Sequence, residues 1–188
     1  MRKTIAFNMA TLDGFFAGPG GEIDWHHVDE EFNEFAIAQL NSAGGLLFGR
    51  VTYQGMASYW PTDVAMKNDP IVANKMNTLP KTVFSRTLER VEWSNTRLVK
   101  GNIAEEILKL KQQPGKDLLL FGSADLASAL TNLGLIDEYR VMVNPVILGS
   151  GKPLFKGTKD KLDLKLVSAK RFRNGNVLLC YEPNGHEH

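Results

Sequence analysis

Three short stretches of the sequence place residues suited to phosphate binding directly after apolar runs: LLFGRVTY, TVFSR and LLLFGSADL. Glycines and other small residues there let a ligand approach the backbone closely. An arginine can contact a phosphate with two N–H groups, and serine or threonine hydroxyls can donate to one. Each stretch alone also fits an ordinary surface helix start, but three in one sheet suggest a dinucleotide carrying an extra phosphate. The candidate residues are Gly49, Arg50, Thr52, Ser85, Arg86, Gly122, Ser123, Ala124, Asp125 and Leu126.

A fourth stretch, GSGKP at residues 149–153, resembles the end of a P-loop but lacks two of its requirements. The motif G-x-x-x-x-G-K-[ST] needs a glycine where Val146 stands and a hydroxyl residue where Pro153 stands. Proline also has no N–H to donate to a phosphate. The Rossmann motif G-x-G-x-x-G does not follow any predicted strand either. We therefore interpret GSGKP as a tight turn with Lys152 at the surface.

Strand and helix patterns alternate along the middle of the chain, and their order sets where the phosphate-binding stretches lie. Apolar runs predict strands at 3–10, 44–49, 81–85, 116–122 and 138–149. Helical patterns predict helices at 28–43, 50–59, 71–79, 102–113 and 123–134. Strands at 162–172 and 176–182 flank Asn174-Gly175, the strongest short signal for a hairpin. The prediction is an α/β fold whose mostly parallel sheet has antiparallel C-terminal strands and helices on both faces. Ligands of such sheets bind beyond the carboxyl ends of the strands.

Length and composition limit the class of protein. The 188 residues predict a single domain over residues 1–188, and 43% hydrophobic with 23% charged residues is typical of a globular chain. The net charge of +1 gives no electrostatic support for nucleic acid or an anionic membrane as a partner. No apolar run reaches the roughly 18 residues that a membrane helix needs. We therefore expect a cytoplasmic protein whose ligand is a small molecule.

Other polar and aromatic residues leave alternatives open. Asp13, in the Gly-rich loop TLDGFFAGPGGEIDW, either shapes that loop or faces a substrate, where it is the candidate catalytic group. The loop itself is predicted to be a mobile lid. Trp25, Tyr53 and Trp60 either form an aromatic wall for a flat heterocycle or pack in the core. The adjacent histidines at 26–27 have no recognised zinc spacing, so we expect no metal site.

The order and spacing of ATLDG, FGRVTY, FSR, FGSADLASAL…GLIDE and NPVILGSGKPLF resemble the dihydrofolate-reductase-like family. The resemblance is strongest to the reductase (C-terminal) domain of the bifunctional riboflavin-biosynthesis deaminase-reductase, in stand-alone form, and it covers residues 3–182. It implies a three-layer dihydrofolate-reductase-like fold that binds NADPH across the ends of its strands. It also implies a homodimer, because relatives pair through the C-terminal part of the sheet.

The same resemblance implies a role for each phosphate-binding stretch. Residues 49–52 match the segment that holds the 2′-phosphate and pyrophosphate of NADPH, and residues 85–86 match a second 2′-phosphate contact. Residues 122–126 match the pyrophosphate loop, with Gly-Ser where the family has Gly-Gly. Ala10 matches the first-strand position that meets the nicotinamide, and Trp25 matches a tryptophan beside the cofactor.

Two positions depart from the riboflavin enzymes. Phe121 stands where they have a glutamate and Ile23 where they have a serine, and both of those residues contact the ribosylaminouracil substrate. Polar groups of that substrate would be left unpaired here, at high cost in a desolvated site. The acids at 29–34 lie where dihydrofolate reductases place their pterin-binding carboxylate, and we interpret them as a solvated face. The predicted substrate-side residues are Asp13, Trp25, Tyr53, Trp60 and Phe121.

Two hypotheses about function follow. The first is an NADPH-dependent reductase of a small heterocyclic substrate, pterin or aminopyrimidine-like, related to 5-amino-6-(5-phosphoribosylamino)uracil reductase. The second is a catalytically silent NADP-binding sensor or partner protein with the same fold. Turnover with any reducible heterocycle discriminates between them.

Overall fold

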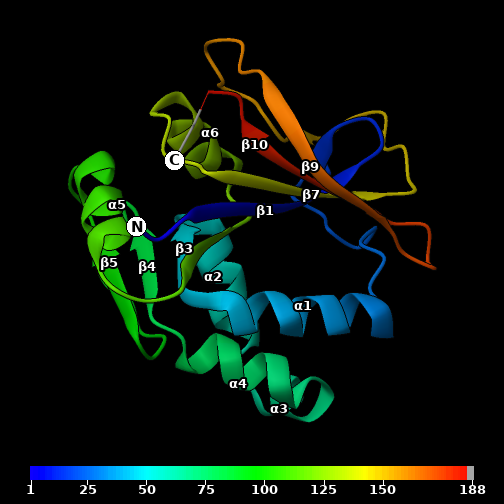
Figure 1. Cartoon of the computed structure of the whole chain (residues 1–188). Coiled ribbons are helices and arrows are strands. Elements are labelled where there is room, and N and C mark those ends of the chain that lie inside the picture. Colours follow the sequence, from blue (N-terminus) through cyan, green and yellow to red (C-terminus); the bar gives the residue numbers. More distant parts are fainter. Residues whose placement is uncertain (186–188) are drawn as a thin grey trace.

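The sheet at the centre of the protein is built from strands that the apolar runs of the sequence predict. The computed structural model describes residues 1–185. The main strands are β1 Thr4–Thr11, β3 Ala43–Gly49, β4 Lys81–Phe84, β5 Thr96–Val99, β6 Asp117–Phe121, β7 Glu138–Asn144, β9 Leu164–Arg171 and β10 Val177–Pro183. Within the described residues they form one eight-stranded sheet in the order β5-β4-β3-β6-β1-β7-β10-β9 (Figure 1). The first six strands in this order, β5, β4, β3, β6, β1 and β7, are parallel to one another. Strands β10 and β9 are antiparallel to their neighbours. The predicted sheet, with antiparallel strands at one edge, is confirmed.

Helices cover both faces of this sheet and give the molecule three layers (Figure 1). Their bounds are α1 Glu30–Ser42, α2 Arg50–Tyr59, α3 Asp63–Asn68, α4 Pro70–Thr78, α5 Ile103–Gln112 and α6 Ala124–Asn132. Along β3, Leu47 packs toward α5 and α6, whereas Leu46 and Phe48 pack toward α1, α2 and α4. Each such fully buried side chain stabilises the fold by about 1.5–3 kcal/mol. No helix within residues 1–185 is long and apolar enough to cross a membrane.

The helix ends follow from local sequence. Asn102 caps α5, its side chain accepting the N–H of Glu105 at 3.3 Å, as the sequence predicts. Asp29 caps α1 in the same way, 2.9 Å from the N–H of Phe32. Strand β5 and helix α3 are absent from the prediction, because both are short and partly exposed and neither has a clear apolar period. Strand β7 ends five residues earlier than predicted, at Asn144, because Pro145 cannot donate to a neighbouring strand.

Outside the main sheet, GSGKP forms a turn that also anchors a distant loop. Strand β8 (Lys152–Pro153) begins inside this stretch and pairs with β2 (Phe15–Ala17), in the loop that follows β1. Gly149 has φ +78°, and a side chain at Gly151 would collide with the carbonyl of Ala17 and the ring of Phe15. The turn with an exposed Lys152 is confirmed, and Gly151 also makes room for the loop.

Candidate functional site

Three neighbouring strands end together at one edge of the sheet, each followed by one of the phosphate-binding stretches. Strand β3 lies between β4 and β6. Gly49 at the end of β3 is opposite Phe84 at the end of β4, so Arg50 and Ser85 leave adjacent strands about 4.8 Å apart. Gly122 follows β6 on the other side of β3. The structure thus brings all three predicted stretches to the carboxyl ends of consecutive strands.

The ends of β3 and β6 approach each other through their glycines. A side chain at Gly49 would collide with Ser123, and a Cβ on Gly122 would lie 2.9 Å from Oγ1 of Thr52. The backbone of Gly122 and Ser123 is left-handed at both residues, with φ +55° and +48°. For a serine that conformation costs on the order of 1 kcal/mol. Close approach and a strained backbone at the same place are typical of a functional site.

The start of α6 leaves two backbone donors free. Ser123 Oγ accepts the N–H of Leu126 at 3.4 Å. The backbone N–H of Leu126, one of the predicted cofactor-binding residues, is therefore already engaged in a hydrogen bond. The side chains of Ala124 and Leu126 are buried, and Asp125 is exposed. The N–H groups of Ala124 and Asp125 precede the first intrahelical bond, so they are the donors that an anion at this helix end can use.

Arg50 opens α2 where a positive charge is unfavourable for the helix. Gly49 supplies no side-chain cap, and the first turn contains no acid. The partial positive charge of a helix N-terminus repels a cation and attracts an anion. Arg50 and Arg86 are exposed, and neither belongs to an ion pair within residues 1–185. The Arg50 guanidinium donates one hydrogen bond, to Oε1 of Gln54 at 3.3 Å. Its remaining N–H groups, the Arg86 guanidinium and the helix end are available to a bound phosphate.

Ser85 forms a tight turn at the same corner. Its Oγ accepts the N–H groups of Thr87 at 3.2 Å and Leu88 at 3.1 Å. A serine oxygen that accepts two hydrogen bonds still carries its own proton, which can be donated to a phosphate. Arg86 lies inside this turn, as the second residue of the loop that leaves β4.

Ala10 lies near the end of β1, two strands from this corner. It is buried, and strand alternation puts it on the face of α6 with Ala6, whereas Met9 is on the α1 face with Phe7. Its carbonyl accepts the side-chain amide of Asn144 at 3.4 Å. The nicotinamide contact predicted for Ala10 stays a prediction.

The carboxylate of Asp13 ties the loop after β1 to the GSGKP turn. It accepts the Thr11 hydroxyl at 2.6 Å and the N–H groups of Leu148 at 3.2 Å and Gly149 at 2.8 Å. These hydrogen bonds, led by that from Thr11, hold the pKa of Asp13 below its ordinary value. A carboxylate kept charged is a poor proton donor, so the structure favours the loop-shaping interpretation over the catalytic one.

Trp25 and its neighbour His26 form a small aromatic unit in the same loop. The indole N–H of Trp25 donates to the carbonyl of Glu22 at 3.1 Å, and the two rings meet edge to face with centroids 4.5 Å apart. Burial lowers the pKa of His26 to about 4, so its imidazole is neutral at physiological pH. Its Nε2 is buried without a hydrogen-bond partner among residues 1–185.

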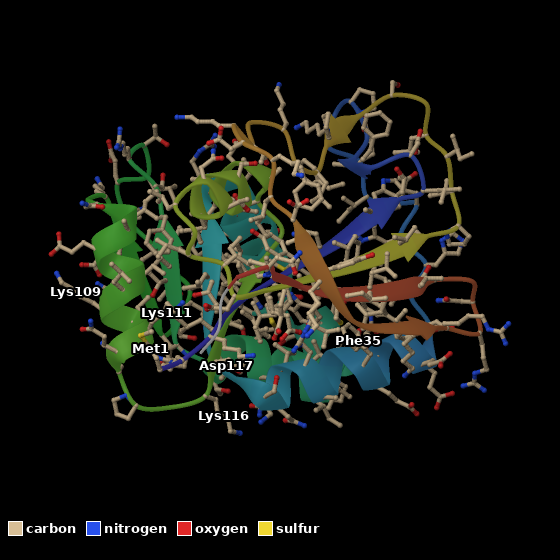
Figure 2. All side chains as sticks on the ribbon, turned by 45° about the horizontal axis from the view of Figure 1, so that its top comes forward. Met1, Phe35, Lys109, Lys111, Lys116 and Asp117 are labelled. Carbon is tan, nitrogen blue, oxygen red and sulfur yellow. The ribbon has the colours of Figure 1, made fainter. Side chains whose placement is uncertain are left out.

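Aromatic side chains occupy the α1 side of the sheet next to the end of β6. Phe121 meets Phe7 edge to face at 6.0 Å and stacks on Phe48 at 6.3 Å. Phe35 of α1 lies on the sheet side of its helix, 5.5 Å from Phe7 (Figure 2). The acids of α1 point elsewhere; Glu31, for example, accepts the backbone N–H of Arg173 at 2.8 Å. The predicted substrate side is therefore apolar, with no α1 carboxylate among its rings.

The two remaining aromatic candidates have partners within α2 and its surroundings. Tyr53 is buried, and its hydroxyl accepts the backbone N–H groups of Glu92 and Trp93. The indole N–H of Trp60 points at Sδ of Met56, 3.1 Å away. Both rings belong to the core around Phe48, so packing, the second of the two alternatives, accounts for their position.

A family model described as the RibD C-terminal domain matches residues 2–178. The chain belongs to the RibD C-terminal domain family. It is 37% identical to the uncharacterised protein YyaP of Bacillus subtilis, over 98% of this chain and 96% of that protein. Among solved structures, it is similar to a putative riboflavin biosynthesis protein from Shewanella sp. PV-4, with a TM-score of 0.75 and 24% identity, covering 96% of this chain and 98% of that one.

The fold is shared more widely. A dihydrofolate reductase from Enterococcus faecalis, solved in complex with NADP(H), has a TM-score of 0.64 at 14% identity, over 97% of this chain and 96% of that one. The predicted dihydrofolate-reductase-like fold and the predicted family are thus confirmed. The RibD C-terminal family and this fold are those of reductases.

In this RibD C-terminal domain, two asparagines with no functional signal in their local sequence anchor the Gly-rich loop. Asn144 Oδ1 accepts the N–H of His27 at 2.8 Å, and Asn176 Nδ2 donates to the carbonyl of the same residue at 2.9 Å. Both asparagines are fully buried. Each stands next to a turn signal, Asn144-Pro145 or Asn174-Gly175, where an asparagine is ordinarily interpreted as a turn former.

Proposed function

We propose that the protein is an NADPH-dependent reductase of a small planar substrate. The observation that supports this most directly is the corner formed by Arg50, Ser85 and Arg86. Two arginines that form no ion pair within residues 1–185, a hydroxyl and an uncapped helix N-terminus follow the ends of two adjacent strands there. A phosphate monoester is the ligand whose charge and geometry match such donors. The 2′-phosphate distinguishes NADPH from NADH, so this corner is a cofactor-selecting site.

The neighbouring strand end fits the rest of the cofactor. The missing side chains at Gly49 and Gly122 let the starts of α2 and α6 pack against each other. The N–H groups of Ala124 and Asp125, which have no partner among residues 1–185, can then donate to a pyrophosphate at this helix end. When bound, NADPH supplies the hydride. The protein orients the cofactor and keeps water from the reacting atoms. The Gly-rich loop with Trp25 is the part of this chain placed to cover it.

The half-buried rings of Phe35 and Phe121, which pack on the buried Phe7, support a flat, weakly charged substrate, pterin or aminopyrimidine-like. Stacking against such rings favours a planar heterocycle. The phosphoribosylaminouracil of riboflavin synthesis is a poorer match, because Phe121 offers its polar groups no partner. This part of the proposal concerns substrate class and stands apart from the cofactor assignment.

Phe121 also supports a second candidate function, a protein that binds NADP without turnover. Stopped-flow oxidation of NADPH against a panel of pterins, aminopyrimidines and quinones tests the two. Oxidation that depends on any one substrate, and that is lost in Arg50→Ala at subsaturating NADPH, supports the reductase. Tight NADPH binding with no turnover across the panel contradicts the reductase and supports the silent binding protein.

We also propose that the protein is a cytoplasmic homodimer. Strand β9 is the edge of the main sheet, and its Leu166 and Val167 are 52% and 53% exposed. An edge strand with exposed apolar side chains and no further neighbour among residues 1–185 is a surface that another strand can cover. A second copy presents the same strand in the antiparallel direction about a two-fold axis, so one patch serves both partners.

A further inference from the structure

Tyr53 connects α2 to the loop that follows β4. Its hydroxyl oxygen accepts the backbone N–H groups of Glu92 at 3.1 Å and Trp93 at 3.3 Å. Its ring also packs against the indole of Trp93, with centroids 6.3 Å apart. Within the described part of the chain, no other α2 side chain hydrogen-bonds to residues 85–95. The Tyr53 hydroxyl is therefore the polar link between helix and loop.

That loop is fixed at its two ends, with Arg86 at the first. Ser85 holds the turn that contains Arg86 through its two backbone hydrogen bonds. At the other end, the indole N–H of Trp93 donates to Oδ1 of Asn77 at 2.7 Å. Leu88, between the two ends, packs against the core around Phe48. Arg86 and the two N–H groups that Tyr53 accepts therefore belong to one short loop that is held at both ends.

The two arginines of the proposed 2′-phosphate corner belong to these two different segments. Arg50 is in the first turn of α2, one helical turn before Tyr53, whereas Arg86 is in the loop. One phosphate held by both guanidinium groups requires a fixed separation between the segments, because charge-assisted contacts weaken when either donor shifts. The binding energy of the phosphate thus depends on a contact made away from it.

We propose that Tyr53 is a positioning residue for cofactor discrimination: its hydroxyl holds the Arg86 loop at the distance from Arg50 at which one phosphate is bound by both. The proposal rests on the proposed function and adds a residue that does not touch the cofactor. It assigns Tyr53 an indirect role in place of a direct substrate contact.

Tyr53→Phe is the variant that tests this most narrowly. It removes one oxygen, keeps the ring against Trp93, and leaves two backbone N–H groups without an acceptor. The Trp93 N–H is buried, so the loop must shift to find a new partner for it. We expect the Kd for NADPH to rise about tenfold and the Kd for NADH to change by less than about twofold, since only the former uses Arg86.

Tyr139→Phe is a matched control. It deletes another buried tyrosine hydroxyl, one that contacts Oγ1 of Thr131 at 3.0 Å on the opposite face of the sheet. Any general loss of stability affects both variants, and thermal unfolding measures it. The ratio of the Kd values for NADH and NADPH changes only in Tyr53→Phe.

A double-mutant cycle with Arg86→Ala completes the experiment. In the Arg86→Ala background, we expect Tyr53→Phe to change the Kd for NADPH by less than about twofold. If Tyr53→Phe weakens both cofactors equally, or neither, while Arg50→Ala still selectively weakens NADPH, the positioning role is wrong and the proposed function stands. If the wild-type protein does not prefer NADPH, both fail.

Discussion

The backbone N–H of Ser123 donates to Oγ1 of Thr52 at 3.0 Å, which joins the start of α6 to the first turn of α2. The two residues are 71 positions apart in the sequence. They meet because Gly49 and Gly122 let the ends of β3 and β6 come together. The two helix N-termini are thereby held in one fixed relation, with their free N–H groups on the same edge of the sheet.

Removing this hydrogen bond should loosen the junction. Thr52→Val keeps the shape of the side chain but leaves the Ser123 N–H without its acceptor, at a cost of about 1–3 kcal/mol of folding free energy. The Kd for NADPH should rise by about tenfold, because the free donors of α6 are no longer held in place. Urea unfolding and cofactor titration measure the two effects. Thr52→Ser, which keeps the hydroxyl, should stay close to wild type; equal behaviour of both variants would contradict the role of the hydrogen bond.

The space at Gly49 is a second requirement of the site. Gly49→Ala places a methyl group against the side chain of Ser123, so both stability and NADPH binding should fall. Gly55 provides the control, since it lies within the helix that Gly49 precedes, and an added Cβ there would meet nothing within 4 Å. Gly55→Ala should stabilise α2 by about 1 kcal/mol and leave cofactor binding unchanged. Thermal unfolding with and without NADPH separates the two. Tolerance of alanine at both positions would show that the close approach is not needed.

His26 should make stability depend on pH in a defined window. Burial lowers its pKa from 6.5 to about 4, so between these values the unfolded chain binds a proton that the folded protein does not. Stability should therefore fall as the pH is lowered from about 6.5 to about 4. His26→Phe should lose this component, while His27→Phe, which leaves His26 in place, should keep it. Urea unfolding at a series of pH values provides the measurement, and a slope unaltered by His26→Phe would refute the assignment.

The edge strand β9 should determine oligomeric state. Leu166→Asp puts a charge into the exposed apolar strand, where a partner copy would have to bury it unpaired. The wild-type protein should have the mass of two chains by light scattering, and the variant the mass of one. Lys165→Glu, on the neighbouring exposed position, tests whether any charge change has this effect. A wild-type protein of single-chain mass at micromolar concentration would remove the homodimer proposal.

The sequence predicts the strands and helices of the sheet well because their signals are local. The residues that define an element lie within it or a few positions away, as do apolar runs such as LLLF, turn residues and capping residues. The phosphate-binding stretches can be predicted for the same reason, because each directly follows a predicted strand. Membership of the family adds the relative order of those strands. Strand β5, by contrast, has four residues with no clear alternation, and its pairing with β4 is visible only in three dimensions.

What the sequence does not predict is contact between distant segments. β2 pairs with β8 more than 130 residues later, and Asn144 and Asn176 bind the backbone of His27 from the far end of the chain. The sequence leaves the role of Asp13 open for the same reason, because its partners at Leu148 and Gly149 cannot be identified from its neighbours. The sequence does not predict the partners of the Tyr53 hydroxyl either, because they lie in the loop after β4, about 40 residues later.

Separate titrations of NADPH and NADH, with the wild-type protein and with Arg50→Ala, test the proposed function most directly. We predict that the wild-type protein binds NADPH at least about tenfold more tightly than NADH, as expected for a phosphate held by charge-assisted hydrogen bonds. Arg50→Ala should lose most of that preference, with the Kd for NADH within about twofold of wild type. Equal affinity of the wild-type protein for the two cofactors, or no binding of either, would contradict the assignment of the corner at Arg50 and Arg86 to the 2′-phosphate.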